Sequence, residues 1–155
     1  MPPPPAEGRP RVRTLDLGLA CCAVEVARAR TAVERFLAAD ADAQAGRSAP
    51  QGAAVTDVLV VAGTLTDAMA SLVLARYEDL AAEAGTGLRV VSFGSCANTG
   101  GPYWDSYAVT KGVDQLLPVD AYVAGCPTHP DAVREALLTL GLGSGTAPVG
   151  EAHRA

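Results

Sequence analysis

The stretch Asp57-Val58-Leu59-Val60-Val61-Ala62-Gly63 decides the fold class, because almost every residue in it is apolar and three of them are valines. A continuous apolar run of this length is typical of a parallel strand that is covered on both faces. Leu88-Arg89-Val90-Val91-Ser92-Phe93 and Ala121-Tyr122-Val123-Ala124 are two further β-like runs. We therefore expect strands of one parallel sheet at these three positions.

Helical patterns follow the first and the last of these strands. A helix is predicted after residue 63, and it ends near Gly85 and Gly87. Its expected core face consists of Met69, Leu72, Val73, Tyr77 and Leu80. Residues 128–131 have the types that open a second helix, with a proline where its missing N–H is not needed. The apolar residues of this helix are Val133, Leu137 and Leu140.

The beginning of the chain adds one more β-α unit. Residues 12–19 alternate loosely and predict a strand, and an alanine-rich helix over about 21–39 is supported by charged pairs with helical spacing. Residues 40–54 lack apolar periodicity and predict a surface loop. Repeated β-α units predict an α/β fold, a flavodoxin-like three-layer domain with a mainly parallel four-stranded sheet.

Length and composition indicate one domain. The 155 residues are 49% hydrophobic and 19% charged, and we expect a single domain over 11–140, with a proline-rich disordered leader at 1–10 and a disordered tail at 141–155. The net charge of −5 and the single lysine argue against a nucleic-acid partner. No apolar stretch approaches the roughly 20 residues that span a bilayer. The start of the chain does not resemble a signal peptide, so we expect reduced cysteines in the cytosol.

All four cysteines follow predicted strands. Cys21 and Cys22 come after the first strand, Cys96 after the strand that ends at Phe93, and Cys126 after the last strand. Ligands of an open parallel sheet bind at this edge, although an isolated cysteine is more often a small buried hydrophobe. Four thiolates suit zinc or an iron–sulfur cluster equally as donors. The gaps of 0, 73 and 29 residues mildly disfavour a zinc knuckle, and the sequence pattern leaves the metal open.

Five motifs, in this order, resemble those of the B-type subunit of proton-pumping NADH-quinone oxidoreductase, respiratory complex I. They lie at 18–25, 60–66, 94–98, 106–107 and 118–127, and the similarity covers about 120 residues. The motifs are Gly-Leu-Ala-Cys-Cys-Ala-Val-Glu, Val-Val-Ala-Gly-Thr-Leu-Thr, Gly-Ser-Cys-Ala-Asn, Ser-Tyr and Pro-Val-Asp-Ala-Tyr-Val-Ala-Gly-Cys-Pro.

The resemblance implies that Cys21, Cys22, Cys96 and Cys126 hold one [4Fe–4S] cluster, the terminal centre that passes electrons to quinone. The electrons come from NADH through FMN and other iron–sulfur centres on other subunits, and proton translocation occurs in the membrane arm. The implied partners are the large quinone-site subunit and a neighbouring iron–sulfur subunit, with quinone at the subunit interface. The chain would be a peripheral protein on the cytoplasmic side of the cell membrane, contacting the membrane through its partners and carrying no complete active site itself.

Two alternatives stay open beside this interpretation. The same fold and cysteine set occur in the small electron-transfer subunits of membrane-bound, energy-converting [NiFe] hydrogenases. The other alternative is a non-redox module in which the thiolates hold structural zinc or no metal.

The chain departs from the pattern of the family around the cysteines. Leu17 replaces an aromatic residue, and 48–52 lacks the arginine that the family has near the cluster. Asp67 and Ala68 replace an asparagine and a lysine. The family's Pro-Gly-Cys-Pro-Pro is Ala-Gly-Cys-Pro-Thr at 124–128, which ends in Thr128. Every ligand is retained, and the residues around the ligands are changed.

Two acidic residues near the cysteine motifs carry competing interpretations. Glu25 lies close to the cysteine pair and has a role in proton coupling or, more simply, pairs with Arg28 on a helix surface. Asp67 suits the start of a helix better than a proton relay.

The aromatic residues Tyr103, Trp104 and Tyr107 predict either an anchor for a partner subunit or ordinary core packing. His129 is interpreted as a helix-start residue, and His153 lies in the expected tail. The sequence contains no recognisable Ser-His-Asp or paired-carboxylate arrangement.

Overall fold

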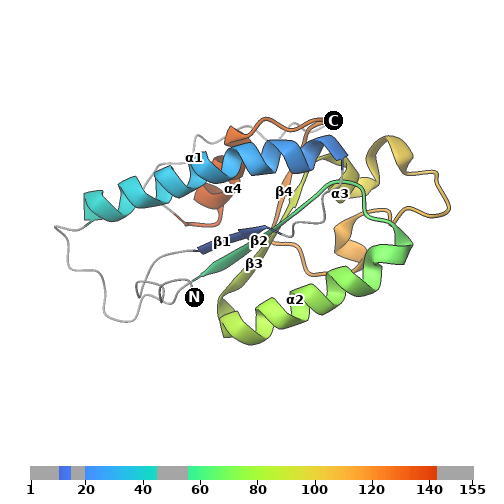
Figure 1. Ribbon diagram of the computed structural model, residues 1–155, viewed down its shortest axis with the longest axis horizontal. Coiled ribbons are helices and arrows are strands. Elements are labelled where there is room, and N and C mark those ends of the chain that lie inside the picture. The colour runs from blue at the N-terminus through green and yellow to red at the C-terminus, as the bar shows by residue number, and fades with distance from the viewer. Residues whose placement is uncertain (1–10, 15–19, 45–55, 143–155) are drawn as a thin grey trace.

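The computed structural model describes residues 11–14, 20–44 and 56–142, which form a parallel sheet with helices on both faces (Figure 1). The sheet has four strands in the order β1-β2-β3-β4, and every neighbouring pair is parallel. The strands are β1 (Arg11–Thr14), β2 (Asp57–Ala62), β3 (Leu88–Phe93) and β4 (Ala121–Val123). The predicted α/β architecture with a parallel sheet is confirmed, and the strand at 88–93 has the predicted bounds.

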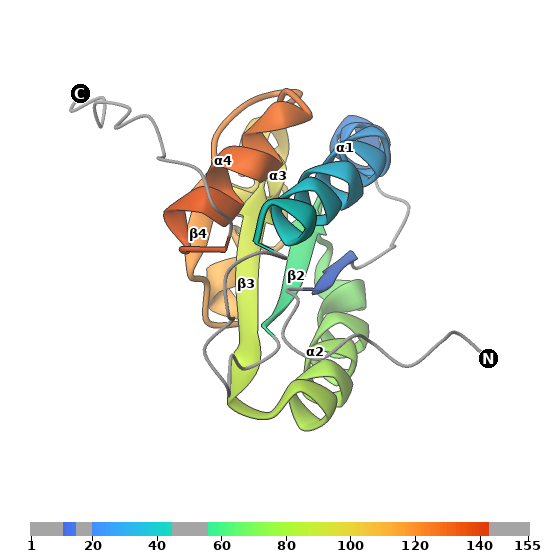
Figure 2. The same ribbon diagram turned by 90° about the vertical axis from the view of Figure 1, so that its left-hand side faces the viewer.

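The helices form one layer on each face of the sheet (Figure 2). Helices α1 (Ala20–Gln44) and α4 (Asp131–Thr139) cover one face, and α2 (Ala70–Ala84) covers the other. Short helical segments complete the chain, namely η1 (Asp67–Met69), η2 (Gly85–Gly87), α3 (Ser95–Thr99), η3 (Gly101–Tyr103) and η4 (Val113–Gln115). No helix in the described ranges has the length and apolarity that a membrane span needs.

Strand β2 explains why its sequence is apolar without interruption. Val58 and Val60 pack in the core layer under α1 and α4, whereas Leu59 and Val61 pack in the layer under α2. Alternate side chains of a strand point to opposite faces, so a strand between two helical layers needs apolar residues at every position. All six residues of β2 are buried.

Two predicted elements differ from the structure at their edges. Helix α1 continues to Gln44, so the first part of the expected loop at 40–54 is helical; alanine and glutamine favour a helix even where no apolar face is needed. The prediction that Leu72 lies on the core face of α2 is wrong, because its side chain is 55% exposed while Val73 and Leu80 are buried. Leu72 and Val73 point about 100° apart on the helix, and the sheet takes only Val73.

Strand β1 begins one residue earlier than expected and ends at Thr14. The rest of that predicted strand, at 15–19, lies outside the described residues, as do the expected leader at 1–10, most of the expected loop at 45–55 and the expected tail from 143 onward. The domain bounds therefore stay a prediction.

Candidate functional site

The segments that carry the four cysteines come together at the carboxyl end of the sheet (Figure 1). Cys21 and Cys22 lie in the first turn of α1, Cys96 lies in α3 directly after β3, and Cys126 follows β4 by three residues. Ala20, which precedes the pair, has a φ of 60°, a left-handed conformation that is costly for a residue with a Cβ. Parallel topology thus places the cysteine segments from three β-α connections at one edge.

Two of the sulfurs are buried and two are exposed. The Cys22 residue is 2% exposed and Cys96 is 5% exposed, whereas Cys21 and Cys126 are exposed. Burial raises the pKa of the Cys22 thiol, and the nearby Cys21 and Cys96 raise the pKa further. A hydrogen bond from the backbone N–H of Thr128 to Cys22 acts in the opposite direction and lowers the pKa. The Cys22 thiol therefore loses its proton less readily than an exposed cysteine does.

Two glycines make room for the buried sulfurs. A Cβ added to Gly94, whose φ is 89°, would lie 2.5 Å from Cys22 Sγ. A Cβ added to Gly101, whose φ is 55°, would lie 2.9 Å from Cys96 Sγ. Only glycine suits both the backbone conformation and the space at these positions. The backbone consequently approaches both sulfurs more closely than a side chain would allow.

Hydrogen bonds fix the Cys96 segment to the Cys126 segment. The backbone N–H of Gly94 donates to Val123 O at 2.8 Å, and the backbone N–H and the hydroxyl of Ser95 both donate to Gly125 O, at 2.8 and 2.9 Å. The side chain of Asn98 makes two further hydrogen bonds in this region. Its Oδ1 accepts a 2.6 Å bond from the buried hydroxyl of Ser92, and its Nδ2 donates to Val123 O at 3.1 Å. Cys96 and Cys126 are therefore carried by loops with a fixed mutual position.

Two hydroxyl groups at this edge are buried without a hydrogen-bond partner in the described structure. They are Oγ1 of Thr64, two residues after β2, and Oγ1 of Thr128, two residues after Cys126. A buried hydroxyl that has lost its hydrogen bonds to water and gained no partner destabilises the folded state, so such groups are rare in native structures. A bound group with acceptor atoms would supply a partner, and the sulfide and thiolate sulfurs of an iron–sulfur cluster are acceptors of this kind.

No three Cys, His, Asp or Glu side chains within the described ranges are grouped as ligands of one metal ion. Cys21 and Cys96 both lie close enough to Cys22 to raise the pKa of its thiol, and hydrogen bonds from Ser95 to Gly125 O join the Cys96 segment to the Cys126 segment. Four thiolates suit zinc or an iron–sulfur cluster as donors, so the donor set alone leaves the metal open.

The two acidic residues near the cysteine motifs make ordinary contacts. Glu25 Oε1 lies 3.8 Å from Arg28 Nη1, which confirms the predicted helix-surface pair. Glu25 and Arg28 line an open groove of about 410 Å³ together with the segment 127–131. Asp67 lies in the first turn of η1 as expected, and its Oδ1 accepts a 2.9 Å hydrogen bond from the Thr110 hydroxyl. Asp67 is thus a brace between the loops that follow β2 and α3.

The three predicted aromatic residues lie on the surface. Tyr103, Trp104 and Tyr107 are all exposed, Tyr107 by 97%, so core packing within the described chain does not explain them. Lys111 Nζ lies 5.8 Å from the ring centroid of Trp104, a weak cation–π contact. An exposed aromatic cluster in a chain with 5% aromatic residues favours the interpretation as a contact surface.

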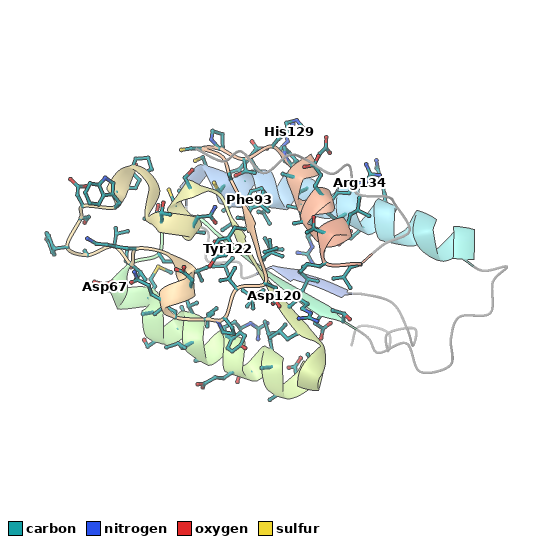
Figure 3. The ribbon with its side chains drawn as sticks, turned by 180° about the vertical axis from the view of Figure 1, so that it is seen from behind. Asp67, Phe93, Asp120, Tyr122, His129 and Arg134 are labelled. Atoms are coloured by element: carbon teal, nitrogen blue, oxygen red, sulfur yellow. The ribbon has the colours of Figure 1, made fainter. Side chains whose placement is uncertain are left out.

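His129 lies at the outer end of α4, on the other side of the sheet from Asp67 (Figure 3). Its Nδ1 accepts a 3.3 Å hydrogen bond from the backbone N–H of Asp131, the first residue of α4, which confirms it as a helix-start residue. His153 lies outside the described residues.

Sequence reasoning assigned no hydrogen-bonding role to three residues of the site, namely Asn98, Thr64 and Thr128. Asn98 stands two residues after Cys96 in the third of the five motifs, but its partner Val123 becomes its neighbour only in the folded sheet. Thr128 had a signal in the sequence, because it stands where the family pattern has a proline.

The fold and the site place this protein in the class of α/β domains that carry cysteines at the carboxyl edge of a parallel sheet. Comparison with known proteins gives the family: residues 20–140 match the family model described as NADH ubiquinone oxidoreductase, 20 kDa subunit. A B-type subunit of NADH-quinone oxidoreductase from Streptomyces griseus is 45% identical over 125 residues, 81% of this chain and 49% of the relative. The B-type subunit from Clostridium beijerinckii is 42% identical over 126 residues, 81% of this chain and 69% of the relative. The chain belongs to the family of the 20 kDa, B-type subunit of NADH-quinone oxidoreductase.

Two further comparisons show how much of the relatives' length this chain covers and which solved structure shares its fold. The chain spans about half to two thirds of the length of several curated relatives, for example 62% of a B-type subunit from Salinispora tropica, with 43% identity over 125 residues. Among solved structures, a chain of the membrane-bound sulfane sulfur reductase, an archaeal respiratory membrane complex, matches with a TM-score of 0.56 and 22% identity. That match covers 86% of this chain and 69% of the other, and it supports the α/β fold.

Proposed function

We propose that this chain is an electron-transfer subunit of a membrane-associated NADH-quinone oxidoreductase and that Cys21, Cys22, Cys96 and Cys126 hold one [4Fe–4S] cluster. The observation that carries the proposal is the meeting of the three cysteine segments at one edge of the sheet, beside two enclosed hydroxyls without partners in the described structure. When bound, the cluster would accept and release one electron at a time.

The chain's own residues would hold the cluster in a rigid setting that is dry on one side. The buried thiols of Cys22 and Cys96 would bind it as thiolates, and their burial excludes water from that side. Gly94 and Gly101 let the backbone approach the same two sulfurs. The hydrogen bonds of Ser95 to Gly125 O keep the loops of Cys96 and Cys126 at a constant spacing. A rigid site suits electron transfer, because little has to move when the charge changes.

The proposed partners follow from the family and from the surface. The large quinone-site subunit and a neighbouring iron–sulfur subunit would cover the exposed side of the cysteine site, where Cys21 and Cys126 are open. Quinone would accept the electrons at that subunit interface, after NADH oxidation and electron transfer through FMN and other centres elsewhere. The chain would lie at the cytoplasmic side of the membrane as a peripheral protein and contact the membrane through these partners, which would carry out proton translocation.

The test is anaerobic purification of the chain with any subunits that copurify, followed by iron and acid-labile sulfide analysis and EPR of the dithionite-reduced protein. We expect four irons and four sulfides per chain and a reduced-cluster signal. Cys96→Ser is expected to lose the signal, whereas Thr99→Ser, an exposed position of the same helix, is expected to keep it.

Three results would contradict parts of the proposal. Stoichiometric zinc would identify the non-redox module, and a metal-free chain after anaerobic work would leave the cysteines without a redox role. A copurifying large subunit that contains nickel would assign the chain to the hydrogenase alternative and would leave the cluster ligands as proposed.

A further inference from the structure

Thr128 is buried beside the cysteine site without a structural role for its hydroxyl. The residue is 3% exposed, and its Oγ1 has no hydrogen-bond partner in the described part of the chain. It does not cap α4, because the cap residue is Pro130 and the N–H of Asp131, the first residue of the helix, donates to His129 Nδ1 instead. A serine or threonine hydroxyl near a helix start normally serves that purpose. The donor of Thr128 is therefore available to something that the described chain itself does not provide.

The Thr128 hydroxyl oxygen lies in the neighbourhood of the Cys22 sulfur. A Cβ added to Gly94 would lie 2.5 Å from Cys22 Sγ and 3.3 Å from Thr128 Oγ1, so both atoms approach the same point at the end of β3. The backbone N–H of Thr128 already donates to Cys22. One residue thus brings two hydrogen-bond donors to the same side of the site.

A proline at this position would supply neither donor, because it has no N–H and no hydroxyl. Hydrogen bonds to the sulfurs of a cluster are among the factors that set its reduction potential. They favour the reduced state, which carries one more negative charge, since hydrogen bonds to charged acceptors are stronger. Removing the donors of Thr128 therefore has a defined electrochemical direction.

We propose that Thr128 tunes the cluster, with its backbone N–H and its hydroxyl both donating to the sulfurs at the Cys22 side, and that it raises the reduction potential. The proposal rests on the proposed function, because it needs a cluster at the four cysteines. Thr128 would act as a positioning residue: it binds no iron and carries no electron, and its effect is on the equilibrium between the oxidised and the reduced cluster.

The experiment is an EPR-monitored redox titration of the complete chain, purified anaerobically with its copurifying subunits. Thr128→Val removes the hydroxyl and keeps the shape and the N–H. Loss of this donor is expected to shift the reduction equilibrium about tenfold toward the oxidised cluster, which is about 59 mV lower for a one-electron couple. Thr128→Pro removes both donors and is expected to lower the potential further, whereas Thr128→Ser is expected to keep the wild-type value.

Thr139→Val is the matched control. Thr139 is exposed on α4, and its hydroxyl donates to Glu135 O at 3.0 Å inside the helix. The same substitution there removes a hydroxyl without reaching the cysteine site, so the potential is expected to stay at the wild-type value.

Equal potentials for the wild type, T128V and T128P would overturn the inference while leaving the cluster itself established. A wild type without a cluster would contradict the proposed function and, with it, this inference. If T128V carries no cluster, Thr128→Ser and Thr128→Ala take its place, and equal potentials for these two would overturn the role of the hydroxyl.

Discussion

Replacing Asn98 by alanine is expected to destabilise the protein and to loosen the Cys96 segment. Asn98 Oδ1 accepts a 2.6 Å hydrogen bond from the hydroxyl of Ser92, a strand residue with no exposed surface, and Asn98 Nδ2 donates to Val123 O. Without the amide, the Ser92 hydroxyl stays buried with no partner on α3. An unsatisfied buried group costs about 1–3 kcal/mol, so we expect the free energy of unfolding to fall by about 2 kcal/mol.

A double-mutant cycle separates this bond from general damage to the helix. Ser92→Ala removes the donor, and Asn98→Ala in that background no longer strands a hydroxyl, so its cost is expected to shrink by about 1 kcal/mol. The assay is urea unfolding, with thermal unfolding as a second readout in which each kcal/mol shifts Tm by about 2–4 °C. Thr99→Ala, an exposed position on the same helix, is the control and is expected to stay within about 0.5 kcal/mol of the wild type. Additive effects of the two substitutions would refute the assigned hydrogen bond.

Three further predictions test the site, the sheet and the surface. Gly94→Ala places a Cβ 2.5 Å from a cysteine sulfur at a residue whose φ is 89°. We therefore expect the free energy of unfolding to fall by about 2–4 kcal/mol and the iron content of the protein to fall as well. An iron content equal to that of the wild type would contradict the tight fit at this position. Asp120→Ala is expected to lower the free energy of unfolding in urea by about 1–2 kcal/mol, because the Asp120 carboxylate accepts a 2.8 Å hydrogen bond from a backbone N–H of β3. Arg89→Ala removes only the partly exposed ion pair of 2.9 Å, so it is expected to cost less than about 1 kcal/mol. A larger cost for Arg89→Ala than for Asp120→Ala would contradict this assignment. Trp104→Ala and Tyr107→Ala are expected to change the free energy of unfolding by less than about 0.5 kcal/mol, because both side chains are exposed. Both substitutions are expected to reduce the recovery of copurifying subunits in a pull-down. Unchanged recovery would argue against a contact surface at these residues.

The fold was predictable wherever one sequence pattern has one physical cause. The apolar run of β2 requires two covering layers, and the structure places alternate residues of that strand in two core clusters. Leu72 shows the limit of the same reasoning. Helical spacing defines a broad apolar stripe, but the contact with the sheet takes only part of it, and that choice depends on how α2 is rotated.

The site was predictable to the level of topology. The rule that parallel strands end at a common edge is enough to place the three segments that carry the cysteines at one edge of the sheet. The details depend on segments that are distant in the chain: Asn98 donates to Val123 O on the neighbouring strand, and Thr128 reaches the neighbourhood of Cys22 from another connection. Such contacts follow from packing in three dimensions, and a single sequence does not encode them in its spacing.

Native mass spectrometry of the anaerobically purified chain tests the central claim most directly. We expect one dominant species that exceeds the chain mass by four irons and four sulfides, and we expect this added mass to be lost in Cys126→Ser. A species with one bound zinc, or the bare chain alone, would contradict the proposal that the four cysteines at the edge of the sheet hold an iron–sulfur cluster.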